Sequence, residues 1–196
     1  MKLVILDRDG TLSEESAEFV ETPDAWRPLP GALEAIAKLN HAGWHVVIAT
    51  NQAGLGRGLF EVAALNAIQA KMHRMLAAVG ARVDATFYCP HAPDEGCHCR
   101  KPEPGLFEQI GERYGIELKG TPTVGDSVED LQAGAAAGCE PHLVLTGLGA
   151  VYRGRSLPDV FPPGTTVHPD LAAFAEFLIA RAEVSAKALR LQQGAV

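Results

Sequence analysis

The sequence predicts an α/β fold, a doubly wound parallel sheet with helices on both faces. One observation is that short apolar runs alternate with longer helical patterns along the whole chain, which is typical of strand–helix–strand units. A second is that residues 3–6, LVIL, are wholly apolar, as in a strand buried on both faces. A third is that polar, chemically active residues follow several of these runs, where such sheets bind their ligands.

The elements follow in order along the chain. Strands are expected at residues 3–6, 44–49, 83–89, 121–124 and 142–145, and helices at residues 31–40, 61–79, 104–114, 129–137 and 171–191. Glycines that suit a helix end follow four of the helices, at Gly43, Gly80, Gly115 and Gly138. Residues 147–163 are rich in Gly, Pro and Arg and are expected to form a loop or a lid-like segment. The last turns become polar, so residues 187–196 are expected to fray.

Length and composition narrow the class of protein. A chain of 196 residues without a linker-like stretch predicts a single domain over residues 1–196. The net charge of −7 argues against a nucleic-acid or anionic-membrane surface. No apolar run approaches the ~20 residues of a membrane span, and the N-terminus does not resemble a signal peptide. We therefore expect a cytoplasmic protein, in which clustered cysteines indicate metal rather than disulfides.

Polar residues follow four of the expected strands. The segments are Asp7-Arg8-Asp9-Gly10-Thr11, Thr50-Asn51-Gln52, Arg100-Lys101-Pro102 and Gly125-Asp126-Ser127. An acid at one strand end is common, but four such segments on four strands are hard to explain as solvated loop ends. Clustered carboxylates repel one another unless a cation joins them, and oxygen ligands with open positions suit Mg²⁺. The pattern therefore predicts a magnesium site at one edge of the sheet.

The segment CPHAPDEGCHCRKP, residues 89–102, holds three of the four cysteines. Structural Zn²⁺ takes four nitrogen or sulfur ligands, and the expected set is Cys89, His91, Cys97 and Cys99. His98 is the alternative to His91, and solvent-exposed reduced thiols are the alternative to a metal site. Zinc would hold an otherwise mobile loop and so place Arg100 and Lys101 at the rim of the sheet.

Together these motifs resemble those of the haloacid dehalogenase-like phosphatases. The cysteine loop is similar to that of their zinc-loop branch, which contains heptose bisphosphate phosphatases and histidinol-phosphatases. The resemblance covers about residues 1–147, and residues 51–58 and 100–105 look more like the heptose enzymes. The chain has no room for a folded cap domain between its strands, so an open site is expected.

The resemblance implies a role for each motif residue. Asp7 would be the nucleophile that forms an aspartyl-phosphate, and Asp9 the general acid and base. Thr50 and Lys101 would stabilise the transferring phosphoryl group. Mg²⁺ would be held by Asp7, the backbone carbonyl of Asp9, and Asp126.

The resemblance also implies a set of substrate contacts. These are Asp7, Arg8, Asp9, Glu15, Ser16, Ala17, Glu18, Thr50, Asn51, Gln52, Ala53, Arg100, Lys101 and Ser127. Arg100 would recognise a second phosphate, because a guanidinium can bind it through two hydrogen bonds. Arg57 could contribute, although a surface charge at a helix start is an equal reading. Ser127 departs from the family pattern, since many relatives carry Lys or Arg there.

The expected activity is that of a Mg²⁺-dependent sugar-phosphate monoesterase. The resemblance implies removal of the 7-phosphate of a heptose 1,7-bisphosphate, in making nucleotide-activated heptose for surface lipopolysaccharide. Histidinol-phosphatase is the close alternative. A phospho-accepting receiver domain is less favoured because no suitable acid ends the third strand, and a zinc-held binding module leaves the carboxylates unexplained. A monomer is expected, with a phosphorylated sugar as its partner and no nucleic acid or membrane.

Overall fold

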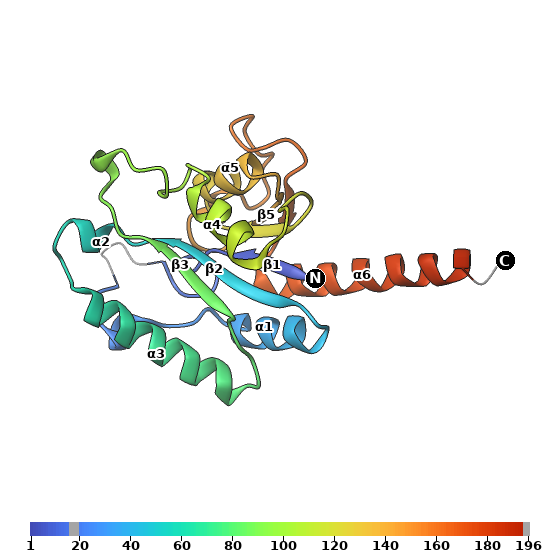
Figure 1. Ribbon diagram of the computed structural model, residues 1–196, viewed down its shortest axis with the longest axis horizontal. Coiled ribbons are helices and arrows are strands. Elements are labelled where there is room, and N and C mark those ends of the chain that lie inside the picture. The colour runs from blue at the N-terminus through green and yellow to red at the C-terminus, as the bar shows by residue number, and fades with distance from the viewer. Residues whose placement is uncertain (16–19, 194–196) are drawn as a thin grey trace.

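The computed structural model describes residues 1–15 and 20–193, with the side chains of the last helix described as far as residue 188. Its centre is a six-stranded parallel sheet in the order β3-β2-β1-β4-β5-β6 (Figure 1). The strands are β1 (Leu3–Leu6), β2 (His45–Asn51), β3 (Ala85–Cys89), β4 (Pro122–Gly125), β5 (Glu140–Val144) and β6 (Thr166–His168). The strand order reverses between β1 and β4, and such a switch point is where doubly wound sheets bind ligands.

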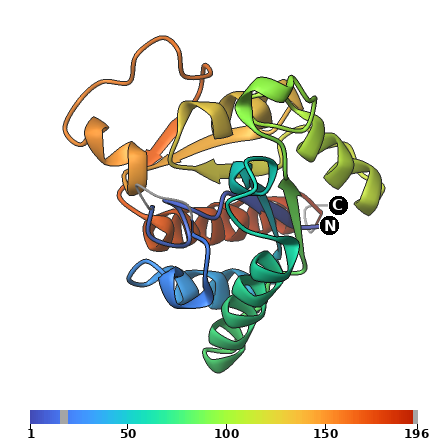
Figure 2. The same ribbon diagram turned by 90° about the vertical axis from the view of Figure 1, so that its left-hand side faces the viewer.

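Helices cover both faces of the sheet. On one face α1 (Ala32–His41), α3 (Val62–Ala78) and α6 (Leu171–Gln193) pack on Val4 and Leu6 of β1. On the other face α4 (Gly105–Tyr114) and α5 (Val128–Ala136) pack on Leu3 and Ile5. Figure 2 shows these two layers with the sheet between them.

The alternation of side chains along β1 explains why this strand is wholly apolar. Val4 and Leu6 join one core and Leu3 and Ile5 join the other, and each is at most 3% exposed. Burying each such side chain stabilises the fold by about 1.5–3 kcal/mol. The strand is therefore a rigid base for the acidic residues that follow it.

The doubly wound α/β fold predicted from the sequence is confirmed, with all five expected strands and five expected helices present. Among the α-helices and strands of the described residues, two were not expected, the short helix α2 (Ala53–Gly56) and the edge strand β6. The segment that forms α2 is rich in glycine, which does not favour a helix, so α2 could not be predicted. Strand β6 has only three residues, too few to produce a periodic pattern. Part of the segment expected as a loop is a 3-10 helix, η3 (Gly147–Tyr152).

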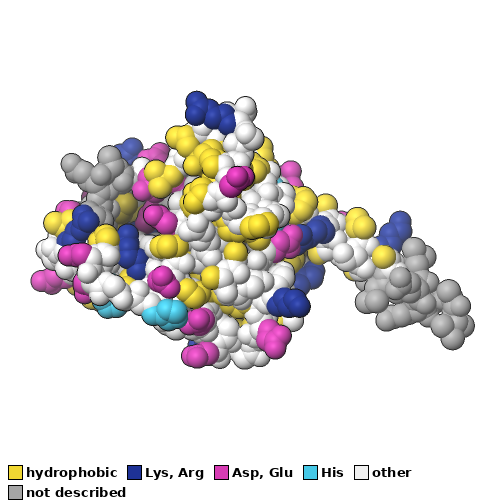
Figure 3. Space-filling view, turned by 90° about the horizontal axis from the view of Figure 1, so that it is seen from above, with side chains coloured by type: hydrophobic (Ala, Val, Ile, Leu, Met, Phe, Trp, Pro, Cys, Tyr) yellow, Lys and Arg dark blue, Asp and Glu magenta, His cyan; other side chains and the backbone are white. Residues whose placement is uncertain are grey.

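The C-terminal helix extends away from the body of the molecule (Figure 3). It includes residues 187–193, where fraying was expected, and residues 194–196 lie outside the described part. On the face shown in Figure 3, basic side chains are scattered among acidic ones and form no single patch. Within the described residues, none of the helices has the length and apolar character that a membrane crossing requires.

Candidate active site

A cavity of about 260 Å³ opens at the carboxyl ends of β1, β2 and β4. Asp7 follows β1 directly and Asp126 follows β4 directly, so the pairing of these two strands brings their carboxylates together. Lys101 arrives from the loop after β3 and Thr50 from the end of β2. The structure thus brings to one cavity the groups that the sequence placed on four strand ends.

Lys101 is the centre of a buried charge network. Its Nζ donates to Asp7 Oδ1 at 2.6 Å and to the Ala49 carbonyl at 2.8 Å, and it lies 2.5 Å from Asp130 Oδ1. Burial alone would lower the pKa of Lys101, but the Asp130 and Asp7 carboxylates raise it above its ordinary value. Lys101 is therefore a fixed cation beside the predicted nucleophile.

Three carboxylates surround the predicted magnesium position. Asp7, Asp126 and Asp130 are all buried, and each places one oxygen within 4.8 Å of the others. Burial and then Asp130 raise the pKa of Asp7 to about 8, against the pull of Lys101, while burial and then Asp7 raise the pKa of Asp126 to about 9. Three buried carboxylates around one lysine do not all ionise readily without a further cation, and this oxygen-rich set fits Mg²⁺.

Asp9 is held apart from that cluster by three side chains. Arg8 donates to both of its carboxylate oxygens, at 3.0 and 2.7 Å, Ser13 Oγ donates at 3.1 Å and Gln52 Nε2 at 3.2 Å. The Asp9 side chain keeps 21% of its surface exposed and lines the cavity. Such an oriented carboxylate at the cavity edge suits an acid and base acting on a bound group.

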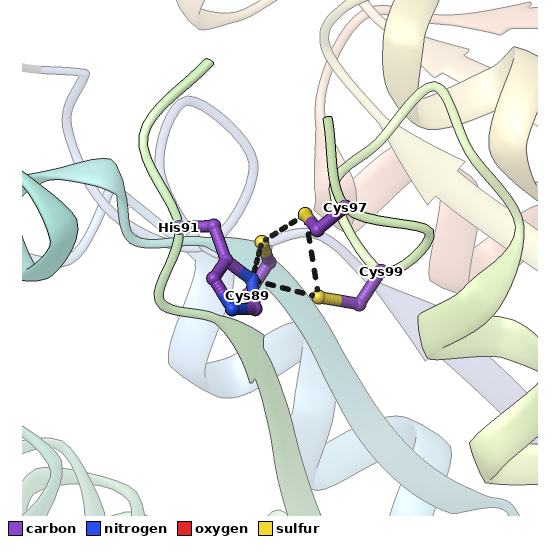
Figure 4. Close-up of side chains that lie close together, drawn as sticks. All are labelled: Cys89, His91, Cys97 and Cys99. Carbon is purple, nitrogen blue, oxygen red and sulfur yellow. Dashed lines mark hydrogen bonds between the residues drawn. The ribbon is translucent and has the colours of Figure 1, made fainter. Parts of the chain in front are cut away.

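The second cluster of predicted ligands lies on the loop after β3, and Figure 4 shows its four side chains pointing toward one another. Cys89 Sγ lies 3.5 Å from both His91 Nδ1 and Cys97 Sγ, and Cys99 Sγ lies 3.2 Å from His91 Nδ1 and 3.6 Å from Cys97 Sγ. Four donors at these separations fit the edges of a Zn²⁺ tetrahedron, whose bonds are about 2.0–2.3 Å long. His98 points elsewhere, with Nε2 at 2.8 Å from Glu108, so His91 is the histidine of the cluster.

The chain is similar to known phosphatases over most of its length. A family model described as HAD-hydrolase-like matches residues 98–174. The D-glycero-β-D-manno-heptose-1,7-bisphosphate 7-phosphatase of Bordetella bronchiseptica is 57% identical over 182 residues, which are 93% of this chain and all of that relative. The chain belongs to the D-glycero-β-D-manno-heptose-1,7-bisphosphate 7-phosphatase family.

Other members of this heptose bisphosphatase family are also similar to the chain over most of its length. The Pseudomonas aeruginosa enzyme of the same name is 48% identical over 90% of this chain and 97% of its own length. The crystal structure of the B. bronchiseptica phosphatase, complexed with magnesium and phosphate, matches with a TM-score of 0.88 and 56% identity, covering 92% of this chain and 99% of that one. The resemblance seen in the motifs is thereby confirmed.

Several residues that were predicted to contact the substrate form hydrogen bonds or ion pairs with other residues of the protein. Arg8 lines the cavity, but its side chain is 1% exposed and pairs with Asp9. Asn51 donates from Nδ2 to the Lys101 carbonyl and accepts from the Lys101 amide, both at 3.1 Å. Gln52 also bonds to Thr50 Oγ1 at 3.1 Å. These side chains hold the catalytic candidates in place.

Ser127, where the resemblance implied a basic residue, caps helix α5. Its Oγ accepts from the Asp130 amide at 3.2 Å and its own amide donates to Asp130 Oδ2 at 3.1 Å, a reciprocal N-terminal cap. Ser127 Oγ also donates to Asp130 Oδ2 at 2.7 Å. Asp130 is thereby fixed, with its other oxygen on Lys101. Asp130 belongs to the same motif as Asp126 and joins the acidic cluster, in keeping with the supporting position beside the metal that the motif implies for it.

The remaining predicted contacts differ in their position. Glu15 lines the cavity as an exposed residue, and partial desolvation of its carboxylate, followed by the Asp9 charge, raises its pKa. Arg100 lines it too, with Nη1 buried and without a hydrogen-bond partner in the described part of the chain. Ala53 is buried and, with Arg57, is absent from the described lining. The predicted contacts at Ser16, Ala17 and Glu18 lie outside the described residues.

Proposed function

We propose that this chain is a Mg²⁺-dependent phosphatase that removes the 7-phosphate of D-glycero-D-manno-heptose 1,7-bisphosphate and leaves the 1-phosphate. The observation that carries the proposal is the buried contact of Lys101 with Asp7, beside Asp126, at the switch point of the sheet. Relatives at 57% and 48% identity bear this activity in their names, and one similar structure is complexed with magnesium and phosphate.

The chemistry divides into two displacements at phosphorus. An Asp7 oxygen attacks the 7-phosphate, the bond to the sugar oxygen breaks, and the leaving alkoxide takes a proton from Asp9. Water then attacks the phosphorus of the aspartyl-phosphate, its proton passes to Asp9, and Asp7 and inorganic phosphate are released. Both steps need positioning and charge more than further covalent chemistry.

The residues around the reacting group supply that charge. Lys101 Nζ, already 2.6 Å from Asp7, faces the phosphoryl oxygens together with Thr50. Asp7, the Asp9 carbonyl and Asp126 would hold Mg²⁺, with Asp130 adjoining, and the ion neutralises phosphoryl charge when bound. Arg8 keeps the Asp9 carboxylate aimed at the leaving oxygen by gripping both of its oxygens.

The cysteine–histidine cluster serves placement and not hydrolysis. Cys99 is followed at once by Arg100 and Lys101, so a Zn²⁺ ion held by Cys89, His91, Cys97 and Cys99 would fix the backbone from which both cations project. Arg100, with an unpartnered buried nitrogen at the cavity, would bind the 1-phosphate.

The product has a phosphate on its anomeric carbon, the group that nucleotide activation uses. We therefore assign the chain to the synthesis of nucleotide-activated heptose for lipopolysaccharide, in the cytoplasm, as a monomer with one domain over residues 1–196. The open cavity and the interspersed surface charges support a small-molecule substrate over a nucleic acid or a membrane.

The test is phosphate release from a panel of substrates with and without Mg²⁺. We expect the highest kcat/KM for heptose 1,7-bisphosphate. When Mg²⁺ is left out of the solution, we expect only background rates of phosphate release. A preference for histidinol phosphate would replace the proposal with the histidinol-phosphatase reading. A stable phosphoprotein that does not turn over would favour a receiver domain.

A further inference from the structure

The turn that follows β5, residues 146–148, reaches across to the acidic cluster. Thr146 Oγ1 donates to the Gly10 carbonyl at 2.6 Å, a contact between segments 136 residues apart. The Leu148 amide donates to Asp126 Oδ2 at 2.7 Å, although the Leu148 side chain itself is 54% exposed. One short turn therefore contacts both the Asp126 carboxylate and the loop that carries Asp7 and Asp9.

Two glycines form the walls around the Asp126 carboxylate. A Cβ on Gly10 would lie 2.0 Å from Asp126 Oδ2, and a Cβ on Gly147 would lie 2.1 Å from the same oxygen and 2.5 Å from Gly10 Cα. Both glycines have positive φ, 82° and 48°. Any side chain at either position would displace the carboxylate, so the packing leaves Asp126 a single narrow slot.

We propose that the 146–148 turn is a positioning device for Asp126, in which the Leu148 amide sets the carboxylate and Thr146 holds the turn against Gly10. The inference rests on the proposed function in that it takes Asp126 as a ligand of Mg²⁺. A carboxylate with one oxygen bound by a fixed amide presents its other oxygen in a defined direction. The Thr146 bond also fixes the Gly10 peptide, next to the Asp9 carbonyl expected to face the same ion.

A purely structural role for Thr146 predicts a different result from a positioning role. As a structural anchor it would stabilise the fold without altering the affinity for Mg²⁺. As a positioning residue it would change the affinity for Mg²⁺ in a chain that remains folded. Thr165 offers a matched control, because its Oγ1 makes an equivalent bond to the Pro162 carbonyl at 2.7 Å elsewhere in the connection between β5 and β6.

The experiment is isothermal titration calorimetry of Mg²⁺ into the full chain without substrate, with thermal unfolding in EDTA as the measure of folding. Thr146→Val, which removes the donor, is expected to weaken Mg²⁺ binding about fivefold, the size of one lost hydrogen bond. Thr146→Ser keeps the donor and is expected to bind within about twofold of the unaltered chain. Thr165→Val is expected to bind Mg²⁺ as the unaltered chain does. Gly147→Ala, whose methyl group enters the Asp126 slot, should weaken binding by more than Thr146→Val.

Two outcomes would overturn the inference, and they are distinguishable. Unchanged Mg²⁺ affinity in a folded Thr146→Val chain, while Asp126→Asn loses binding, would remove the positioning role and leave the proposed function intact. Mg²⁺ binding that Asp126→Asn leaves unchanged would remove Asp126 as a ligand, and both the proposed metal site and this inference would fail together.

Discussion

The two candidate metal centres of this molecule are built in different ways. The carboxylates of Asp7, Asp126 and Asp130 come from the ends of two strands and the start of a helix, and all three are buried. The cluster of Cys89, His91, Cys97 and Cys99 comes from one stretch of eleven residues, and three of its four members are partly exposed. Residues at the ends of strands are held rigidly and form a preorganised site beside an open cavity. The loop site instead has all four of its ligand positions filled by protein side chains, and a bound ion there would fix the conformation of the loop.

The proposed chemistry uses the carboxylate centre directly and the thiol centre only indirectly. The carboxylate centre adjoins the cavity, and Lys101 already contacts Asp7 there. The thiol centre lies next along the chain to Arg100 and Lys101, so under the proposed function it would act on catalysis through the position of these two residues. Substitutions in the carboxylate centre should therefore abolish turnover. Substitutions in the thiol centre should lower the stability of the fold and the affinity for substrate.

The largest expected effect is at Asp7. Asp7→Asn removes the nucleophile while keeping the size of the side chain, so kcat should fall by at least about 10⁴-fold. Zinc content, measured by atomic emission, should stay at about one ion per chain. Turnover by this variant at the normal rate would reject Asp7 as the nucleophile.

Loss of the thiol centre comes next. Cys99→Ser is expected to lower zinc content to a small fraction, reduce the melting temperature and raise KM more than it lowers kcat, because the loop that carries Arg100 loosens. The matched control is Cys139→Ala, a buried cysteine outside the cluster, which should keep its zinc. If removal of zinc left both melting temperature and KM unchanged, the placement role would be wrong.

A substitution at the buried Arg8 distinguishes two roles for this residue, the positioning of Asp9 and direct contact with the substrate. Arg8→Lys loses the paired hydrogen bonds to Asp9, so kcat should fall about 10- to 100-fold with KM nearly constant. A direct substrate contact, as the family resemblance implies, would instead raise KM. Steady-state kinetics together with the pH profile of kcat distinguishes the two.

The smallest expected effect is on stability in acid, far from both centres. His142 Nδ1 lies 3.1 Å from His168 Nε2 in the core between β5, β6 and α6, with Phe174 and Phe177 around them. Glu140 lies 3.7 Å from His142 Nε2 and is itself paired with Arg181. Burial lowers the pKa of His142 to about 4 and also lowers that of His168.

Because the folded-state pKa lies below the unfolded value, the stability from neutral His142 is complete above about pH 6.5 and is lost as the pH falls toward about 4. The loss should be on the order of 2 kcal/mol, measured by urea unfolding at several pH values. His142→Gln should flatten this dependence, and His73→Gln, at an exposed position, should not. An identical slope in the two variants would contradict the assignment.

The sequence allowed the fold and the convergence of polar residues at one edge of the sheet to be predicted, because both follow from short-range patterns. Wholly apolar runs mark strands such as β1, and the acids after β1 and β4 must meet once those strands pair. The gathering of Cys89, His91, Cys97 and Cys99 could be predicted for a similar reason, since all four residues lie in one loop.

What could not be predicted depends on register and on backbone groups. The bonds of Asn51 to the Lys101 backbone and of Ser127 to Asp130 use side chains that could equally have faced a substrate. The histidines at 142 and 168 lie far apart in the sequence, and the pairing of β5 with β6 brings them together. Their contact could not be predicted, because β6 has no sequence pattern of its own. The Leu148 amide has no signature in the sequence, because every residue except proline carries one.

The most direct test of the account is ³¹P NMR of the product formed from D-glycero-D-manno-heptose 1,7-bisphosphate with Mg²⁺ and with EDTA. The account predicts a single sugar product that keeps its phosphate on C1, formed only when Mg²⁺ is present. A product that keeps the 7-phosphate, or equal turnover in EDTA, would contradict it.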